Sequence, residues 1–177
     1  MISRKRIDIF PPVGMILLTT ILLVRCEKGL LRKREGGYMD FITIGEMLID
    51  FIPGKEPGSY VKNAGGAPAN VAIAAARNGL EAGIYCKVGD DDFGRFLLQT
   101  LRENQVTPLA PEMTKEAVTT MSFVSLNEHN DRSFTFARKP GADMLLDKSE
   151  IRDEDLETCR IVQAGSCSLS AGQAVEA

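Results

Sequence analysis

The chain has 177 residues, of which 44% are hydrophobic and 25% are charged, as in an ordinary soluble globular domain. The net charge is −3, but residues 1–38 carry +5 and the remainder carries −8. An acidic body argues against nucleic acid as the main partner, because phosphate binding needs a positive surface. The four cysteines lack CxxC spacing and there is one histidine, so no metal site is expected, and such scattered thiols favour the reducing cytoplasm.

Residues 1–38 form a basic and apolar head whose relevance to the protein is doubtful. A basic start precedes the apolar run VGMILLTTILLV at 13–24, which is shorter than the roughly 20 residues that span a bilayer. Arg25 stands where a cleavage site needs a small residue. Three interpretations stay open: a weak membrane or secretion signal, an extra helix, or sequence upstream of a start at Met39. The last is favoured, because Met39 directly precedes a strand pattern, so membrane attachment is not expected.

The first half of the body alternates strand and helix patterns. Residues 40–52 are almost continuously apolar, which predicts one buried parallel strand. A turn-rich loop covers 53–60, and an alanine-rich helix is expected from about Ala67 to Asn78, with Gly79 as its left-handed terminal residue. A second buried strand at 82–89 and an amphipathic helix at 90–104 follow.

The second half adds a hairpin and a further strand. Residues 119–139 predict two strands around a turn at Asn127–Asp131, in which His129 is expected to be exposed and not catalytic. Short acidic helices and a strand at 160–170 follow. Alternating strands and helices predict an α/β fold, a doubly wound and mostly parallel sheet with helices on both faces. The segments 53–63 and 119–139 are expected to form a small β lid.

Ligands of such sheets bind beyond the carboxyl ends of the strands. The rim there is expected to bring together Asp50, Gly65, Gly66, Gly89, Asp90, Gly165 and Ser166. Glycines let a ligand approach a helix N-terminus, and Asp50 and Asn70 suit the hydroxyl groups of a sugar. The alternative is that the two glycines at 65–66 only pack the helix on a strand and that Asn70 caps a turn. The acidic run 90–92 favours helix capping over metal binding, and neither a P-loop nor a dinucleotide fingerprint is present.

The stretch GGAPANVAIAAARNGLEAGIYCKVGDDDFG at 65–94 resembles the first signature of the PfkB, or ribokinase-like, carbohydrate kinase family. GEMLIDF at 45–51 is similar to the first strand of that family, while RSFTFARKPGADMLL at 132–146 and GSCSLS at 165–170 resemble its fructokinase branch. The similarity covers about residues 40–177.

The resemblance implies phosphoryl transfer from ATP to a sugar hydroxymethyl group, with Mg²⁺, in a doubly wound fold with a β lid. Fructose is the substrate that it favours; 2-keto-3-deoxygluconate, ribose and nucleosides are the alternatives, as is a non-catalytic sugar-binding remnant. A homodimer through the lid is also implied. The substrate-binding residues that it implies are Asp50, Gly65, Gly66, Asn70, Phe123, Arg138, Gly165 and Ser166.

The second family signature, a GAGD stretch, does not occur in this sequence. In the family its Asp is the catalytic base and its glycines hold the phosphate. No catalytic residue is therefore assigned: the base is expected beyond Ala177, and the ATP and Mg²⁺ sites are expected there too. The chain is expected to end inside a helix that begins near Ser170, so it is interpreted as the N-terminal, sugar-binding part of a kinase, truncated before the ATP-binding half. Such a sheet is expected to leave one edge open.

Overall fold

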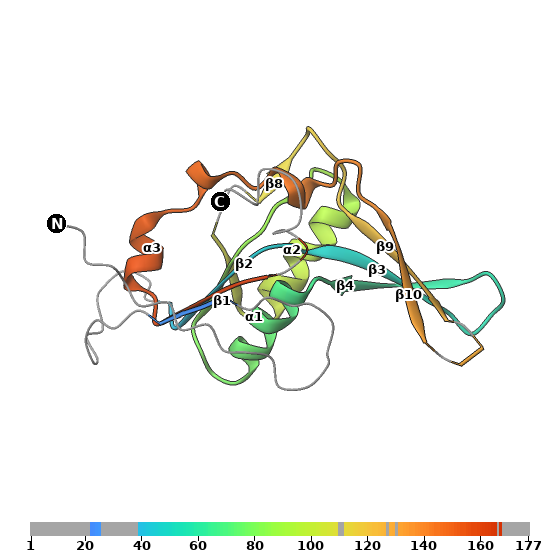
Figure 1. Ribbon diagram of the computed structural model, residues 1–177, viewed down its shortest axis with the longest axis horizontal. Coiled ribbons are helices and arrows are strands. Elements are labelled where there is room, and N and C mark those ends of the chain that lie inside the picture. Colours follow the sequence, from blue (N-terminus) through green and yellow to red (C-terminus); the bar gives the residue numbers. More distant parts are fainter. Residues whose placement is uncertain are drawn as a thin grey trace.

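The larger of the two main sheets has parallel strands and one antiparallel edge strand (Figure 1). The structure is a computed structural model that describes residues 22–25 by their backbone, and residues 39–109, 112–126, 128–129, 131–165 and 167 in full. The strand order is β1-β11-β2-β5-β7. The strands are β1 (Leu22–Arg25), β2 (Phe41–Ile44), β5 (Ala82–Tyr85), β7 (Val106–Pro108) and β11 (Ile161–Ala164).

Each face of this core sheet is covered by helical segments. On one face, α1 (Ala67–Arg77) and α2 (Asp92–Glu103) pack over a buried apolar cluster that includes Ile84 and Leu97. The other face carries the short helices η1 (Ala142–Leu145), η2 (Lys148–Glu150) and α3 (Asp153–Thr158) over a cluster that includes Ile42 and Tyr85. Ile84 and Tyr85 are consecutive, so their side chains point to opposite faces of the sheet. The predicted α/β class, with helices on both faces, is confirmed.

A second sheet projects from the core as the predicted small β lid (Figure 1). Its order is β10-β9-β3-β4, and the strands are β3 (Leu48–Pro53), β4 (Tyr60–Gly65), β9 (Met121–Leu126) and β10 (Arg132–Ala137). Two antiparallel hairpins, β3–β4 and β9–β10, are joined by parallel pairing of β3 with β9. The lid therefore includes residues 48–52, which the sequence pattern had placed in the core.

The prediction of one strand over 40–52 is wrong, because the chain changes sheets at Gly45. This glycine has φ +150°, and a Cβ there would lie 2.6 Å from Cγ of Pro68. The turn separates β2 in the core from β3 in the lid. An apolar run predicts burial, but it does not show where a strand leaves one sheet for another.

The predicted strand 82–89 is divided in the same way. After β5 the chain leaves the core sheet at Cys86 and Lys87, and β6 (Val88–Gly89) then pairs in parallel with β8 (Met113–Thr114). Lys87 is buried, and its ammonium group contacts Glu150 and donates to the carbonyl of Leu145 at 3.2 Å. A charged residue inside an apolar stretch marks this break.

The outer edge of β11 is covered by a strand from the head, so β1 and β7 are the edge strands of this sheet. Leu22–Arg25 pairs with β11 in antiparallel register, with Val24 opposite Val162. The rest of the head lies outside the described residues, and so does the helix expected from about Ser170 to Ala177. Among the helices that the structure describes, none has the length and apolar character needed to cross a membrane.

Candidate functional site

Asp50 lies in the lid strand β3 and not at the end of a core strand, as the sequence pattern had suggested. Its side chain is partly buried, and burial raises the pKa of the Asp50 carboxyl above its usual value, an effect that the nearby Ser122 hydroxyl partly opposes. Ser122 is the register partner of Asp50 on β9, and its buried Oγ meets no acceptor in good hydrogen-bond geometry. Among the described residues no cation pairs with Asp50, so its oxygens are available acceptors.

Gly65, at the end of β4, is required by the Asp50 carboxylate. A methyl group at Gly65 would overlap Oδ2, the nearest atom of that carboxylate. Gly66 has φ +104°, and a Cβ there would lie 3.0 Å from Cα of Met47 and overlap the carbonyl of Glu46. The sequence-based reason for the two glycines was room for a ligand, and the structure adds a second reason, because a Cβ at either position would meet protein atoms.

The N-terminus of α1 follows directly, and no side chain caps it. Gly66 occupies the N-cap position without a side chain, and Pro68 lies in the first turn. Asn70 sits one turn in, where its backbone N–H donates to the carbonyl of Gly66 at 3.0 Å, while the residue is exposed. The alternative that the Asn70 side chain caps a turn is therefore wrong. Free N–H groups and the exposed amide of Asn70 leave this helix start able to bind hydroxyl oxygens.

Gly165, which directly follows β11, also lies beside the start of α1. A Cβ on Gly165 would overlap Cγ of Pro68, and one on Gly45 would also crowd that ring, so Pro68 fills the gap between the two glycines. The Gly165 N–H donates to the carbonyl of Ile44 at 2.9 Å. Asp50, Gly65, Gly66, Asn70 and Gly165 are therefore brought together around the start of α1. Ser166 lies outside the described residues.

Phe123, which the resemblance implies as a substrate-binding residue, lies on the lid face opposite to that of Asp50. Its register partner on β3 is Phe51, and the two rings stack at 5.0 Å with an interplanar angle of 12°. Tyr60 meets both rings edge-on, and Phe93 of α2 meets Phe51 at 5.7 Å. Because neighbouring strand residues point to opposite faces, this aromatic cluster joins the lid to α2 and lies behind Asp50.

The guanidinium group of Arg138 is hydrogen-bonded to other groups of the protein. Its Nε donates to Asp143 Oδ2 at 2.9 Å, and Nη1 and Nη2 donate to the carbonyl of Cys167 at 3.3 and 3.2 Å. Its side chain is 14% exposed. The sequence placed Arg138 as a direct contact of a sugar or phosphate, but it gave no sign of the partner five residues later.

The acidic run at 90–92 caps a helix, as predicted. Asp91 accepts from the N–H of Gly94 at 2.8 Å and from both the N–H and the hydroxyl of Thr119 at 2.8 Å. Burial acts to raise the pKa of Asp91, but hydrogen bonds from Thr119 and Gly94 outweigh it and hold this pKa below its usual value. The N–H of Gly89 donates to the Thr119 hydroxyl at 3.0 Å, so Gly89 and Asp91 connect the segment that enters β9 to the start of α2. No group of three metal-binding side chains occurs among the described residues.

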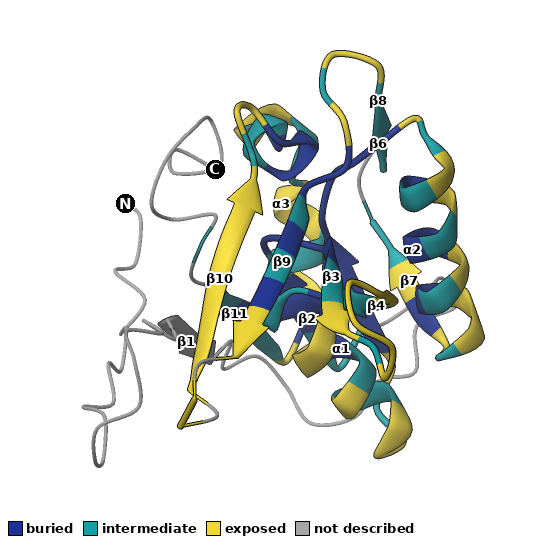
Figure 2. Ribbon diagram, turned by 90° about the vertical axis from the view of Figure 1, so that its right-hand side faces the viewer, coloured by how far each residue is buried: buried dark blue, intermediate teal, exposed yellow. Residues whose placement is uncertain are grey.

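The sequence reasoning missed the rest of the Asp50 face of the lid. Asn63 is the register partner of Asp50 on β4 and is half-buried. By strand alternation the same face carries apolar side chains that are at least 42% exposed, and β10 is exposed along its whole length (Figure 2). These side chains are Ile52, Val61, Leu126, Phe134 and Phe136. The alternating pattern of RSFTFA was the available signal.

Comparison with known proteins gives fructokinases and, among the solved structures, also a putative ribokinase II from E. coli that is 27% identical with a TM-score of 0.62, over 68% of this chain and 41% of that one. A probable fructokinase-2 from Arabidopsis thaliana is 42% identical over 134 residues, which cover 72% of this chain and 41% of the relative. The crystal structure of a fructokinase from Xylella fastidiosa is 36% identical with a TM-score of 0.62, and covers 68% of this chain and 39% of that one. A Vibrio cholerae O395 fructokinase, solved with fructose, ADP and calcium ion, is 40% identical with a TM-score of 0.57, over 64% of this chain and 37% of that one.

The chain thus spans about two fifths of the length of the curated relatives that it matches. Within the chain the match is nearly continuous, because the sequence model of the pfkB family carbohydrate kinases fits residues 40–177. This range contains the lid sheet, the core sheet apart from β1, and all the site residues described above. The chain belongs to the pfkB family of carbohydrate kinases.

Proposed function

We propose that this chain supplies the sugar-binding part of an ATP-dependent kinase that phosphorylates a hydroxymethyl group of fructose. The observation that carries the proposal is the partly buried Asp50 carboxylate, seated on Gly65 beside the uncapped start of α1. A carboxylate without a cationic partner accepts hydrogen bonds from two adjacent hydroxyl groups of a sugar, and such charge-assisted bonds are strong.

The chemistry of the relatives supports the choice of substrates. The Vibrio cholerae structure contains fructose and ADP, and the Xylella fastidiosa fructokinase has also been solved with bound ATP. By analogy, the Asp50 face of the lid would cover the sugar and exclude water from the reacting hydroxyl group, which limits hydrolysis of the nucleotide.

Transfer of the phosphoryl group requires a base and donors for the transferring phosphate. The GAGD stretch, in which the resemblance places the base and the phosphate-binding glycines, does not occur in these 177 residues. We assign the catalytic base and the ATP and Mg²⁺ sites to the part of the relatives that this chain does not match. We therefore expect the chain to bind sugar without turnover. The fully reduced cysteines among the described residues fit the cytoplasm as its location.

Titration calorimetry of the purified chain with fructose tests the proposal. We expect saturable binding that Asp50→Asn abolishes and that Glu56→Gln, in the exposed loop at the lid tip, leaves unchanged. Equal binding by the Asp50→Asn variant would contradict the role of Asp50. The same titration with 2-keto-3-deoxygluconate, ribose and a nucleoside tests the substrate, and a preference for any of them would overturn the assignment of fructose.

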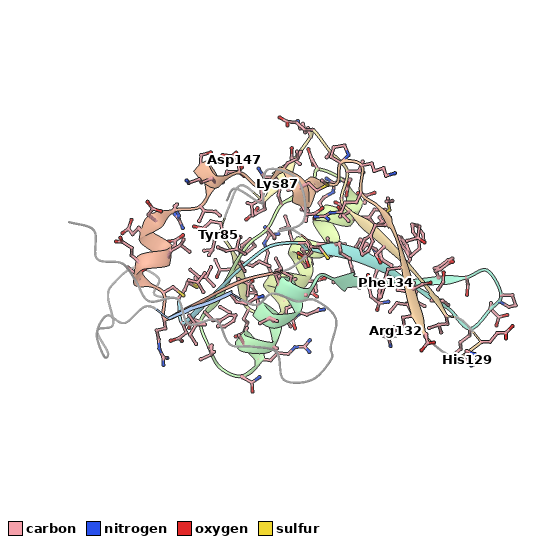
Figure 3. All side chains as sticks on the ribbon, in the orientation of Figure 1. Tyr85, Lys87, His129, Arg132, Phe134 and Asp147 are labelled. Atoms are coloured by element: carbon pink, nitrogen blue, oxygen red, sulfur yellow. The ribbon has the colours of Figure 1, made fainter. Side chains whose placement is uncertain are left out.

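The exposed apolar side chains of the lid also support a homodimer through this face. Phe134 and Arg132 lie on β10 in the projecting part of the lid, away from the core, and His129 lies exposed at its tip (Figure 3). Light scattering coupled to gel filtration should detect a dimer that Phe134→Glu dissociates. Ser133→Glu, on the opposite face of the same strand, is the matched control. A wild-type chain that stays monomeric at high concentration would refute the dimer.

A further inference from the structure

Arg138 connects three segments at the root of the lid. It follows β10 directly, while Asp143 lies in η1 and Cys167 lies three residues beyond β11. Nε and Nη2 contact Asp143 Oδ2 at 2.9 and 2.6 Å, and Nη1 and Nη2 donate to the carbonyl of Cys167. The guanidinium is planar, and its fork of donors therefore serves a carboxylate and a carbonyl at the same time.

Asp143 is enclosed on all sides, with 0% of its side chain exposed. Its second oxygen, Oδ1, accepts a hydrogen bond from the hydroxyl of Thr120, which directly precedes β9. The two oxygens of one buried carboxylate are thus bonded to the entry and to the exit of the hairpin β9–β10. A buried charge of this kind is tolerated only while its partners remain in place.

The backbone closes around these side chains. The N–H of Ala142 donates to the carbonyl of Val118 at 2.9 Å, and Val118 and Gly141 form a parallel bridge. A methyl group at Gly141 would overlap the Thr120 hydroxyl and lie 2.8 Å from Asp143 Oδ1. Neither connection of the hairpin can shift without breaking polar contacts that are shielded from water.

We propose that Arg138 is a positioning residue, which fixes the lid relative to the segment after β11 and does not itself contact the substrate. The segment begins at Gly165, which lies beside the start of α1, so Arg138 sets the separation between the lid and the far wall of the site. That the site between the lid and this wall binds fructose rests on the proposed function. The positioning role rests only on the contacts of Arg138.

Thiol alkylation of the whole chain tests this role without any sugar. Peptide mass spectrometry gives the rate at Cys167, while the buried Cys86 and Cys159 report global unfolding in the same sample. Arg138→Lys keeps a positive charge for Asp143 but lacks the fork that also reaches Cys167. We expect this variant to raise the alkylation rate of Cys167 about tenfold, as for a local opening, with both buried thiols unchanged. Arg95→Lys, at an exposed pair with Asp90, is the matched control.

Two outcomes would overturn the positioning role, and two further outcomes separate it from unfolding and from failure of the sugar site. An unchanged Cys167 rate in Arg138→Lys overturns the proposal, as does an increase seen only when fructose is present. Arg138→Met should open Cys167 further; if that variant exposes all three thiols it has unfolded, and Arg138→Lys decides. If the chain binds no fructose while Arg138→Lys still exposes Cys167, the sugar site fails and the positioning role stands.

Discussion

The core sheet and the lid sheet of this chain differ in how far their faces are covered by other parts of the protein. In the core every residue of β5 is buried, with helical segments on both sides. In the lid every residue of β10 is exposed, the aromatic cluster around Phe51 packs one face against α2, and on the Asp50 face only the part near Ser122 and Val124 is buried (Figure 2). The core sheet is thus covered on both faces, whereas the lid presents an apolar face that a ligand or a second protein surface must cover.

The largest expected effect is a loss of stability from truncation in the core. Ile84 is 0% exposed on the parallel strand β5, and Ile84→Ala should lower the free energy of unfolding by about 2–5 kcal/mol. Phe136 of the lid is 45% exposed, and Phe136→Ala should change this free energy by less than about 0.5 kcal/mol. Urea unfolding measures both. Similar losses for the two variants would show that the lid face is covered in solution.

Glycine substitutions make the next contrast. Gly66→Ala places a methyl group against the backbone of Glu46 at φ +104°, whereas Gly58, at the lid tip, has φ +77° and open space around its Cβ position. Gly58→Ala should cost only the left-handed conformation, about 1–2 kcal/mol. Gly66→Ala should cost more, because the clash adds to that conformational cost. Thermal unfolding of the two variants checks the order, and the reverse order would contradict the close packing at the start of α1.

Asp91 tests the junction between the two sheets. Since hydrogen bonds lower its pKa in the folded protein, the folded state binds fewer protons than the unfolded state. Its contribution is therefore present above the ordinary carboxyl pKa and is lost as the pH falls through the folded value. Asp91→Asn should reduce stability at pH 7 by about 1 kcal/mol and flatten the acid limb of the stability curve. An acid limb identical to that of the wild type would exclude this role.

The smallest expected effect has the opposite sign. Burial raises the pKa of Asp50, so ionisation of this group opposes folding as the pH rises through the window above its ordinary pKa. Asp50→Asn should therefore raise the melting temperature slightly at pH 7 while it abolishes sugar binding. A melting temperature that falls would show that the carboxylate stabilises the lid.

The sequence predicted the elements that have a clear local signal. Helix α1 and its left-handed Gly79, the amphipathic α2 with its acidic cap and the hairpin β9–β10 all follow from periodicity and turn residues. It did not predict where strands change sheets, because Ile44 and Leu48 are equally apolar on either side of Gly45.

The same limit applies to the site residues: those that are close in sequence were predictable, and those that depend on distant pairing were not. The glycines, Asp50 and Asn70 are close in sequence, so their proximity was predictable. The lid face on which Phe123 lies was not predictable, because its register against Phe51 depends on the parallel pairing of two distant hairpins. Arg138 was assigned to the substrate, since no local pattern shows that Asp143 is buried against it.

The change of sheets at Gly45 has a consequence for protein engineering. The lid is built from two separate excursions of the chain, 48–65 and 121–137, whose backbones pair through β3 and β9. Neither excursion can be removed as an independent unit. Deleting one would leave an unpaired strand edge on the other, and such edges promote aggregation. A shortened or transplanted lid must therefore be cut at four points, with both hairpins moved as a pair.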